Sequence, residues 1–274
     1  MGWPFFYIEA IDLGSLSLFL NEETSKHIVQ VLRMQNGEQL QLTDGKGNLF
    51  TAEITDHNRK KCRVAIVQTS HLPPPTHNIT IAISLMKNSS RFEWFLEKAT
   101  EIGVTTILPL ICARTEKQHF RHERMKNILV SAMLQSQQCW LPVLHEPETL
   151  ANIQTLENFQ TLEKFQALEK FQALENFQTL AKFPTLPKFP TLPKLGAYQQ
   201  KFIAHCLDED KGELSEMING DLSTKIILIG PEGDFTKEEV DLAIRNHFIP
   251  VALGKTRLRT ETAGVVSASL LCLV

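Results

Sequence analysis

The pattern of apolar positions changes near residue 75 and divides the chain into two predicted domains. Before that point, three short runs alternate with turn residues in the manner of strands: Gln39–Leu42, Leu49–Ile54 and Arg63–Val67. One helix is predicted among them, from about Glu23 to Met34, with Ile28, Val31 and Leu32 on one face. A stiff proline run, Pro73–Pro75, follows. We therefore predict a small β-rich domain over residues 1–72.

Beyond the prolines, continuous apolar runs alternate with helical periodicity. The runs predict strands at Ile79–Leu85, Thr105–Ile111, Phe202–Ala204, Ile226–Ile229 and Ile249–Leu253. Apolar spacing predicts helices after Ser90, around Met125–Met133 and after Thr236, and the sequence at Ser90 and at Thr236 fits a capping box. Gly103 and the stripe of Val240, Ala243 and Ile244 complete this pattern. It predicts an α/β domain with a mostly parallel sheet over residues 77–274.

A hexapeptide repeat interrupts this second domain, within an insert at about residues 150–198. From Thr155 the unit TLENFQ recurs with small changes, so that Leu and Phe alternate every three residues. Neither a helix nor a strand keeps such positions on one face. Four prolines between Pro184 and Pro193 also forbid a continuous helix in the second half. We interpret the repeat as a tandem expansion within a surface loop.

Composition narrows the function classes. With a formal net charge of −3, the chain has no overall positive potential that would attract nucleic acid. Any basic surface must therefore be local. The five cysteines have neither the spacing of a metal site nor that of a disulfide framework, which predicts reduced, mostly buried thiols and no metal. The first ten residues, MGWPFFYIEA, lack the basic segment and apolar core expected of a signal peptide, and the longest apolar run, Ala263–Val274, is too short to span a bilayer. We expect a soluble cytoplasmic protein without a membrane partner.

Two segments carry the candidate chemistry. In Ile226–Phe235 a buried strand runs into a turn with two glycines and then a capped helix. In Val251–Ala263 a second strand runs into Gly254, a basic loop and a further helix, which Thr260 or Thr262 can cap and whose positive end suits Glu261. Either segment alone is equally an ordinary strand-to-helix turn. Because ligands of open α/β sheets bind at the carboxyl ends of strands, the two together predict a pocket.

The sequence GPEGDF followed by LGKTRLRTETA resembles the signature pair of the 16S rRNA (uracil-N3) methyltransferase family, within the SPOUT superfamily. Weaker similarity covers Gln30–Met34, the strand and helix at residues 83–104 and the strand end at residues 109–115. The resemblance implies a PUA-like RNA-binding domain, then a trefoil-knotted parallel sheet with helices on both faces that forms a homodimer. It also implies methylation of N3 of one uridine in 16S ribosomal RNA, in the small ribosomal subunit, with S-adenosyl-L-methionine as cofactor.

The resemblance also implies the site residues. The cofactor would be surrounded by Ile229, Gly230, Pro231, Glu232, Gly233, Leu253, Gly254, Leu258, Arg259, Thr262 and Ala263. As a catalytic residue, Arg259 would stabilise negative charge on the uracil carbonyls. Glu261 would accept the N3 proton. The alternative is that it caps the start of the helix that follows. A local excess of cations over residues 86–127, extended by the first domain, predicts RNA contacts at Arg33, Lys87, Arg91 and Arg114.

Two other functions fit the same residues. One is a non-catalytic RNA-binding or assembly factor that keeps the fold, which the intact glycine motifs argue against. The other is a SPOUT enzyme that acts on another RNA or another atom. The chain departs from the family pattern at Ala113 and at Leu134–Gln138, where acidic and arginine residues are usual, so contacts with RNA would differ there.

Overall fold

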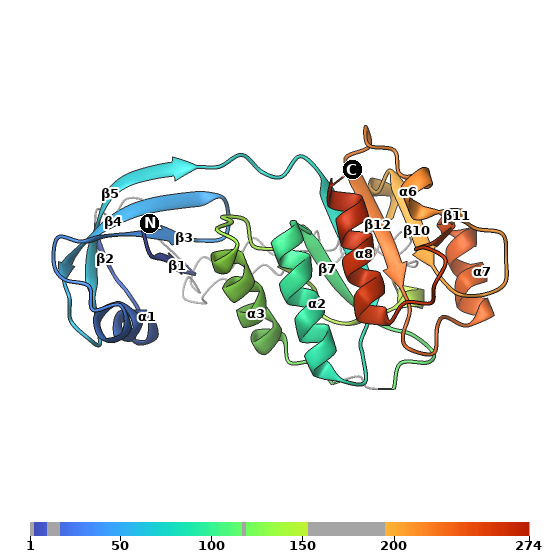
Figure 1. Cartoon of the computed structure of the whole chain (residues 1–274), viewed down its shortest axis with the longest axis horizontal. Helices are drawn as coiled ribbons and strands as arrows, with labels where there is room; N and C mark the ends of the chain where they lie inside the picture. The colour runs from blue at the N-terminus through green and yellow to red at the C-terminus, as the bar shows by residue number, and fades with distance from the viewer. Residues whose placement is uncertain (1–2, 10–16, 117–118, 153–194, 274) are drawn as a thin grey trace, which may run out of the picture. The chain divides into compact units, whose positions relative to one another are not determined.

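The computed structural model describes residues 3–9, 17–116, 119–152 and 195–273 (Figure 1). The chain forms two compact units. The first comprises Met1–Thr76, Leu96–Thr105 and Arg121–Pro142, and the second comprises His77–Phe95, Thr106–Phe120 and Val143–Val274. Within the described residues, no helix has the length and apolar character needed to cross a membrane.

The first unit contains a five-stranded sheet in the order β1-β3-β4-β5-β2. Its strands are β1 (Phe5–Tyr7), β2 (Ser17–Phe19), β3 (Gln39–Thr43), β4 (Asn48–Asp56) and β5 (Arg63–His71). The three long strands form an antiparallel meander, and β1 pairs in parallel with β3. Leu40, Phe50 and Val64 point to one face and are fully buried there. The three predicted strands are confirmed, and the alternation of side chains along them produces the core of this unit.

The helix of the first unit is shorter than the sequence pattern predicts. It runs as α1 (Glu22–Lys26) and continues as a π-helical turn, η1 (His27–Val31). Arg33 then adopts a left-handed conformation with φ 56°, which ends the helix before Met34. The predicted apolar face is wrong as well, because only Ile28 is buried, whereas Val31 is 68% exposed.

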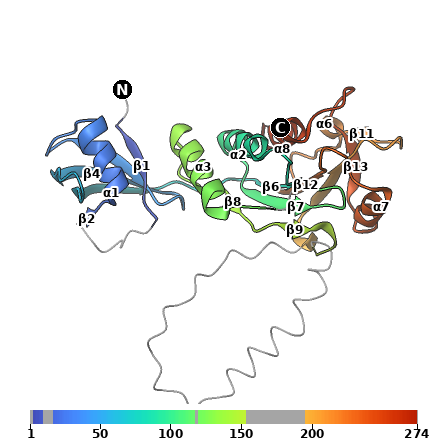
Figure 2. The ribbon, with the colours of Figure 1, turned by 90° about the horizontal axis from the view of Figure 1, so that it is seen from below.

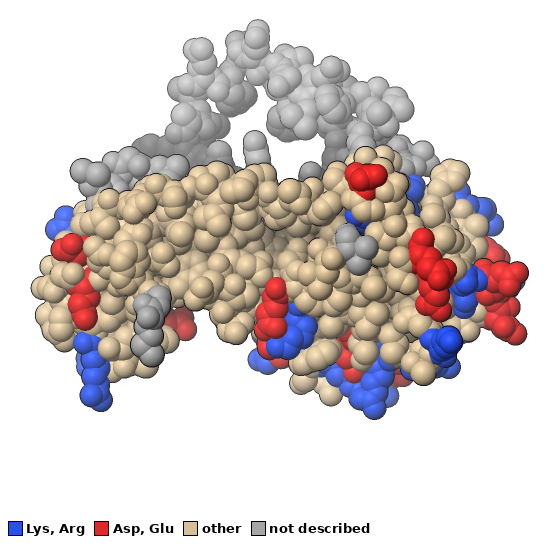
Figure 3. Space-filling model, turned by 45° about the horizontal axis from the view of Figure 1, so that its top comes forward, with Lys and Arg blue, Asp and Glu red and all other residues tan. Residues whose placement is uncertain are grey.

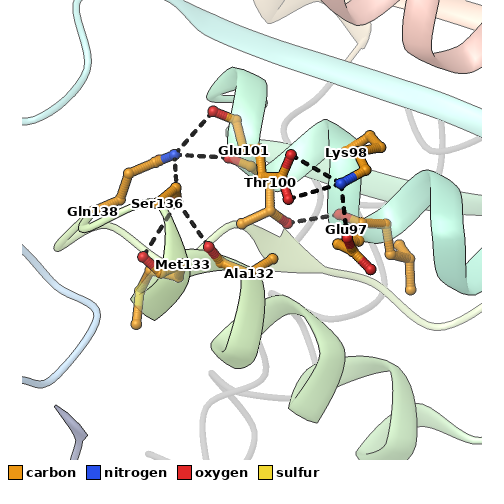
Figure 4. Close-up of polar contacts among 9 residues, drawn as sticks. Glu97, Lys98, Thr100, Glu101, Ala132, Met133, Ser136 and Gln138 are labelled. Carbon is orange, nitrogen blue, oxygen red and sulfur yellow. Dashed lines mark hydrogen bonds and ion pairs between the residues drawn. The ribbon is translucent and has the colours of Figure 1, made fainter. Parts of the chain in front are cut away.

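Two further helices contribute to the first unit: α3 (His122–Gln135) and the second half of α2 (Ser89–Ile102). The amide of Gln138 donates to the carbonyls of Thr100 and Glu101, at 2.9 and 3.2 Å, near the end of α2 (Figure 4). The hydroxyl of Ser136 donates to Ala132 at 2.7 Å and accepts from Gln138 at 3.0 Å. Gln138, one of the positions where the chain departs from the pattern of the family it resembles, thus satisfies helix-end carbonyls.

The second unit is built on a parallel sheet in the order β11-β13-β10-β12-β6-β7-β8, with β9 paired to β7. Its strands are β6 (Asn78–Ser84), β7 (Thr106–Ile111), β8 (Val143–Leu144), β9 (Glu148–Thr149), β10 (Gln200–Ala204), β11 (Gly212–Glu213), β12 (Thr224–Ile229) and β13 (Ile249–Ala252). Its other helices are η2 (Leu195–Ala197), α6 (Leu214–Met217), α7 (Lys237–Arg245) and α8 (Thr260–Leu273). The predicted α/β class with a parallel sheet is confirmed.

Helices cover both faces of this sheet (Figure 2). On one face, Val240 of α7 belongs to the same buried cluster as Ala82 and Leu228. On the other face, Gly264 of α8 lies so close to Ile83 that a Cβ built on the glycine would be 2.7 Å from the Ile83 Cδ1 atom. Because alternate residues of a strand point to opposite faces, the fully apolar strands of the sequence are buried on both sides.

Of the two predicted capping boxes, the structure corrects the first and confirms the second. Helix α2 begins at Ser89 rather than behind a Ser90 cap, and the Asn88 side chain accepts the Ser90 N–H at 3.0 Å. The capping box of α7 is present: Thr236 Oγ1 accepts the Glu239 N–H, and Glu239 Oε2 accepts the Thr236 N–H. Ile244 of the predicted apolar stripe of α7 is 40% exposed.

Helix α8 begins differently from the prediction. The carbonyl of Arg259 accepts the Ala263 N–H at 2.8 Å, so Arg259 occupies the N-cap position. Thr260 is the first helical residue and Thr262 lies inside the first turn, so neither is the cap. Glu261 does lie in the first turn, where a negative charge suits the helix dipole.

The hexapeptide repeat lies outside the described residues, but both of its flanks are described. Leu150 and Tyr198 are buried in the core of the second unit, and the Tyr198 hydroxyl is 2.9 Å from Thr80 Oγ1. Residues at the expected limits of the insert, about 150 and 198, are therefore part of the α/β core.

Candidate functional site

A cavity of about 470 Å³ opens at the carboxyl ends of three adjacent parallel strands, β13, β10 and β12. Its walls come from the residues that follow each strand: Ala204, His205, Cys206, Lys211, Ile229, Gly230, Pro231, Glu232, Asp234, Val251, Ala252, Leu253, Gly254, Lys255, Thr256, Arg257, Leu258, Arg259, Thr260 and Ala263. The two predicted glycine segments thus form one pocket, at the edge of the sheet where α/β folds bind ligands.

The turn after β12 is held in shape from within. A Cβ on Gly230 would be 3.1–3.2 Å from the buried ring and the N–H of Phe235, so the turn packs tightly at this glycine. Asp234 has φ 65°, a left-handed conformation that Asp tolerates better than most residues. Its carboxylate accepts the N–H of Cys206 at 2.8 Å and the N–H of Phe235 at 2.9 Å. Asp234 therefore joins the turn after β12 to the segment after β10.

The segment after β7 fixes the same turn from the other side. Arg114 donates from Nη1 to the carbonyls of Gly233 and Phe235, at 2.7 and 3.4 Å. The N–H of Ala113 donates to Glu239 Oε1 at 2.8 Å. Hydrogen bonds to charged groups are among the stronger ones in proteins, so Arg114 and Glu239 hold the glycine turn in one position.

The loop after β13 supplies the exposed wall of the cavity. Gly254 has φ +119°, a conformation that other L-residues rarely adopt, and a Cβ there would meet nothing within 4 Å. Lys255, Arg257 and Arg259 follow it and are exposed. Since the Arg259 carbonyl starts α8, the position of its backbone is set by that helix. The loop thus brings exposed cationic side chains to the start of α8.

The charges around the cavity favour anionic groups. Four cationic residues line the cavity, Lys211, Lys255, Arg257 and Arg259. Only two acidic residues line it, Glu232 and Asp234. Burial lowers the pKa of His205, with the nearby Lys211 acting in the same direction. Both ring nitrogens of His205 are buried without a hydrogen-bond partner among the described residues. On the face that Figure 3 shows, acidic and basic side chains are interspersed over the second unit.

Most of the predicted cofactor residues line the cavity, and two do not. Nine of them form part of its walls: Ile229, Gly230, Pro231, Glu232, Leu253, Gly254, Leu258, Arg259 and Ala263. Gly233 instead packs against Arg114, and a Cβ on it would be 3.3 Å from the Arg114 Cδ. Thr262 lies in the first turn of α8 without forming part of the wall.

Glu261 lies beside the cavity rather than in it. Its side chain is buried, and Oε1 is 3.5 Å from Arg91 Nε. Its second oxygen, Oε2, is buried and has no hydrogen-bond partner among the described residues. Since a carboxylate can accept hydrogen bonds at both oxygens, Glu261 can still accept a hydrogen bond or a proton at Oε2.

The candidate RNA-contact residues are distributed over both units. In the second unit, Lys87 Nζ is 2.7 Å from Glu116 Oε2, and the Lys87 N–H donates to Glu232 at 3.2 Å. Arg91 pairs with Glu261, and Arg114 holds the glycine turn although it remains exposed. Arg33 lies in the first unit and is exposed. Three of the four thus also have structural partners around the cavity.

Sequence reasoning missed the third wall of the cavity, which Ala204–Cys206 and Lys211 form. The strand Phe202–Ala204 was predicted, but its place between β13 and β12 was not. A sequence signal did exist, because His205 and Cys206 directly follow a predicted strand. It becomes informative only when the strand order is known.

The cavity suits a nucleoside-type cofactor. Its volume lies within the usual range for small-molecule sites. Apolar side chains such as Ile229, Leu253 and Leu258 alternate with the open backbone at Gly254, and cations stand at the rim. Among the described residues, no group of three or more His, Cys, Asp or Glu side chains is arranged to hold a metal ion.

Comparisons with known proteins identify a family. A model of the RNA methyltransferase domain matches residues 73–186 and 177–272, and a model of the RNA methyltransferase PUA domain matches residues 20–67. The ribosomal RNA small subunit methyltransferase E of Synechocystis is 30% identical over 246 residues, which cover 88% of this chain and 68% of the relative.

Solved structures agree with these matches. A structure from Porphyromonas gingivalis, assigned as an rRNA methyltransferase, is 33% identical with a TM-score of 0.76, over 97% of this chain and 95% of the other. A methyltransferase from Legionella pneumophila, solved with bound S-adenosylmethionine, is 25% identical with a TM-score of 0.74, over 99% and 97% of the two chains.

Proposed function

The chain belongs to the RNA methyltransferase family that includes the ribosomal RNA small subunit methyltransferase E proteins, and from this we propose its reaction. The chain transfers a methyl group from S-adenosyl-L-methionine to N3 of one uridine in 16S ribosomal RNA. One observation carries the proposal: the two glycine segments meet in a single cavity at the carboxyl ends of β12 and β13.

The cavity residues are proposed to contact the cofactor mainly through backbone and apolar groups. The proposed cofactor contacts are the backbone and apolar side chains of Ile229–Glu232, Leu253–Gly254, Leu258–Arg259 and Ala263, whereas Gly233 and Thr262, which lie outside the cavity wall, are left out. Apolar walls exclude water, and Gly254 lets a ligand approach the backbone. The cofactor, when bound, supplies a methyl group already activated by a positively charged sulfur. The chain therefore has to position the uracil and assist loss of its N3 proton.

Two side chains are proposed to assist that proton loss. Arg259 is exposed, lies in the cavity wall and stands at the cationic rim. It would stabilise negative charge on the uracil carbonyls as the proton leaves. Glu261 follows two residues later and has a buried oxygen without a partner among the described residues. It would receive the N3 proton, directly or through water, while the S–CH₃ bond breaks and the N3–CH₃ bond forms.

The RNA is proposed to contact Arg33, Lys87, Arg91 and Arg114. Lys87 and Arg114 contact the glycine turn of the second unit, through Glu232 and Gly233, and Arg91 pairs with Glu261 at the start of α8. A phosphate that binds Lys87 or Arg114 would therefore act on the turn that forms the cofactor wall. This arrangement supports a coupling between RNA binding and the shape of the cavity.

The finer architecture is proposed on the family's pattern. The domains are a PUA-like domain at residues 1–72 and a SPOUT domain at residues 77–274, with the C-terminal segment threaded as a trefoil knot. A homodimer is proposed because α8 leaves apolar side chains only partly covered, among them Val265, Val266 and Leu270. We also propose a cytoplasmic location, which a substrate in the small ribosomal subunit supports. Light scattering at micromolar concentration tests the dimer, and a monomer would contradict it.

The reaction is tested by mass spectrometry of ribosomal RNA nucleosides from cells that lack this protein. The 3-methyluridine of 16S RNA should disappear, and it should return when the wild-type chain is supplied. If 3-methyluridine persists while another methylated nucleoside is lost, the chain acts on a different atom or RNA.

A further inference from the structure

An exposed aromatic ring stands among cations on the edge strand of the first unit. The side chain of Phe19 in β2 is 53% exposed. The Lys61 ammonium nitrogen is 4.2 Å from the ring centroid, and the Arg63 guanidinium carbon is 5.6 Å from it. We propose that these three residues, the Phe19 platform, bind an unpaired nucleotide of the RNA substrate, with its base on the ring and its phosphates at the cations. The inference rests on the proposed function.

The sheet register places the platform on the solvent face. Strand β2 pairs antiparallel with β5, and Phe19 lies directly opposite Arg63. Their neighbours Leu18 and Val64 pair with each other and contact the core. Because successive side chains of a strand point to opposite faces, Phe19 and Arg63 share the outer face. An edge strand also leaves this face accessible from the side.

Hydrogen bonds hold the backbone at Lys60 and Lys61 and the side chain of Arg63. Asn58 Oδ1 accepts the N–H groups of Lys60 and Lys61, at 2.9 and 3.3 Å, and so shapes the turn before β5. The Arg63 guanidinium donates to Ser17 Oγ at 3.1 Å. The backbone between the two cations is fixed as well, because Cys62 is fully buried. A site that is ordered in advance loses less conformational entropy when it binds.

The charges of the platform are not neutralised by neighbours. Arg59, Lys60, Lys61 and Arg63 are all exposed, and none of them forms an ion pair with a described residue. By contrast, Lys98 is paired with two carboxylates. Carboxylates do lie nearby, since Asp56 is opposite Arg63 and Glu22 is on α1, but Glu22 is paired with Lys26 at 2.8 Å. A net positive surface remains.

This combination fits a single-stranded nucleic acid better than other anionic partners. An exposed ring provides a stacking surface for any base, and the cations beside it reach the flanking phosphates. A duplex keeps its base faces stacked inside, so it would use only the cations. Phe19 is one ring rather than an extended apolar patch, which is too little for a stable protein interface.

The platform is tested by binding of a 12-nucleotide single-stranded RNA, measured by fluorescence anisotropy over a range of salt concentrations. Phe19→Ala should weaken binding at least about fivefold, because loss of stacking on an aromatic ring has that effect or more. The salt dependence should not change, since no phosphate contact is lost. Lys61→Ala should weaken binding and reduce the slope of log K against log salt by about 0.7.

Matched variants separate the platform from general effects. Phe19→Trp keeps a stacking surface and should bind like the wild type, whereas Phe19→Leu keeps an apolar side chain and should bind like Phe19→Ala. Lys26→Ala removes the same charge from a cation already paired with Glu22, and it should change affinity little. Melting temperature and cofactor binding should match the wild type in all variants, since Phe19 is largely exposed.

The outcomes distinguish the platform from the proposed function. If the wild type methylates 16S RNA but Phe19→Ala and Lys61→Ala bind the oligonucleotide like the wild type, the platform is wrong and the function stands. If Phe19→Ala binds weakly but the wild type transfers no methyl group, the platform stands and the function fails. A further outcome is that Phe19→Ala loses binding to duplex RNA, or to vesicles with anionic lipid, by the same factor as binding to the single-stranded RNA. That result would overturn the nucleotide site as well.

Discussion

Substitution of Gly264 tests how closely α8 lies against the sheet that carries the cavity. A Cβ on this glycine would be 2.7 Å from Ile83 Cδ1 and equally close to two ring atoms of Phe95. Real Cβ atoms essentially never come so close, and both neighbours are fully buried. Gly264→Ala must therefore displace α8, or its neighbours, by several tenths of an ångström.

The magnitude follows from two opposing effects. Overpacking of a buried site costs about 1–3 kcal/mol, and three contacts with immobile side chains place Gly264→Ala near the upper limit. Replacement of a helical glycine by alanine returns about 1 kcal/mol. The net loss of unfolding free energy should be about 2 kcal/mol, which lowers the melting temperature by about 4–8 °C for a chain of this size.

Urea unfolding at equilibrium and thermal melts, both followed by circular dichroism, measure this effect. Gly220→Ala is the matched control, because a Cβ there meets nothing within 4 Å, and its stability should stay within about 0.5 kcal/mol of the wild type. Adding Ile83→Val, which removes the clashing Cδ1, should recover part of the loss in Gly264→Ala. The reasoning is refuted if Gly264→Ala is as stable as Gly220→Ala, or if the double variant loses at least the sum of the single losses.

Three further predictions concern the cavity and the insert. Arg259→Ala should lower kcat about 10²–10³-fold and leave the Kd for S-adenosylmethionine within a few-fold, in single-turnover assays and calorimetry; a proportional loss of affinity would make Arg259 a binding residue. Iodoacetamide at pH 8 should label Cys206, which is exposed in the cavity wall, and bound cofactor should protect it. Burial raises the pKa of Cys112 to about 12, so only about 10⁻⁴ of it is thiolate at pH 8, and faster labelling of Cys112 would contradict the structure. Replacing Thr155–Lys194 by a short flexible linker should keep melting temperature and methyl transfer close to wild type, since longer loops cost only about 0.6 kcal/mol per doubling; activity lost while cofactor binding persists would show a role for the repeat.

Much of the secondary structure was predictable from local patterns. The apolar runs became β6, β7, β10, β12 and β13 within one or two residues, because strands buried on both faces carry uninterrupted apolar sequences. The capping box at Thr236 was equally informative, since both of its hydrogen bonds lie within four residues. The helix start at Asn88 was missed because several polar residues in a row can each cap a helix.

The arrangement of the site depended on contacts that no local pattern contains. Arg114 reaches the glycine turn across 119 residues of sequence, and Ala113 reaches Glu239 across 126. The position of β10 between β13 and β12, which brings His205 into the cavity, is a property of strand order. The two glycine segments could be paired because both follow predicted strands, but the individual site residues came from the resemblance to a family, which predicted nine of the cavity's lining residues.

Methyl transfer by the purified protein tests the central claim most directly. Small ribosomal subunits from cells that lack the protein would be incubated with the wild-type chain and labelled S-adenosylmethionine, without added metal. The RNA would then be digested and its nucleosides separated by mass spectrometry. The account predicts label in 3-methyluridine from 16S RNA, at close to one methyl group per subunit, and its near absence with Arg259→Ala. Label in any other nucleoside, or none with a folded wild-type chain that binds the cofactor, would contradict it.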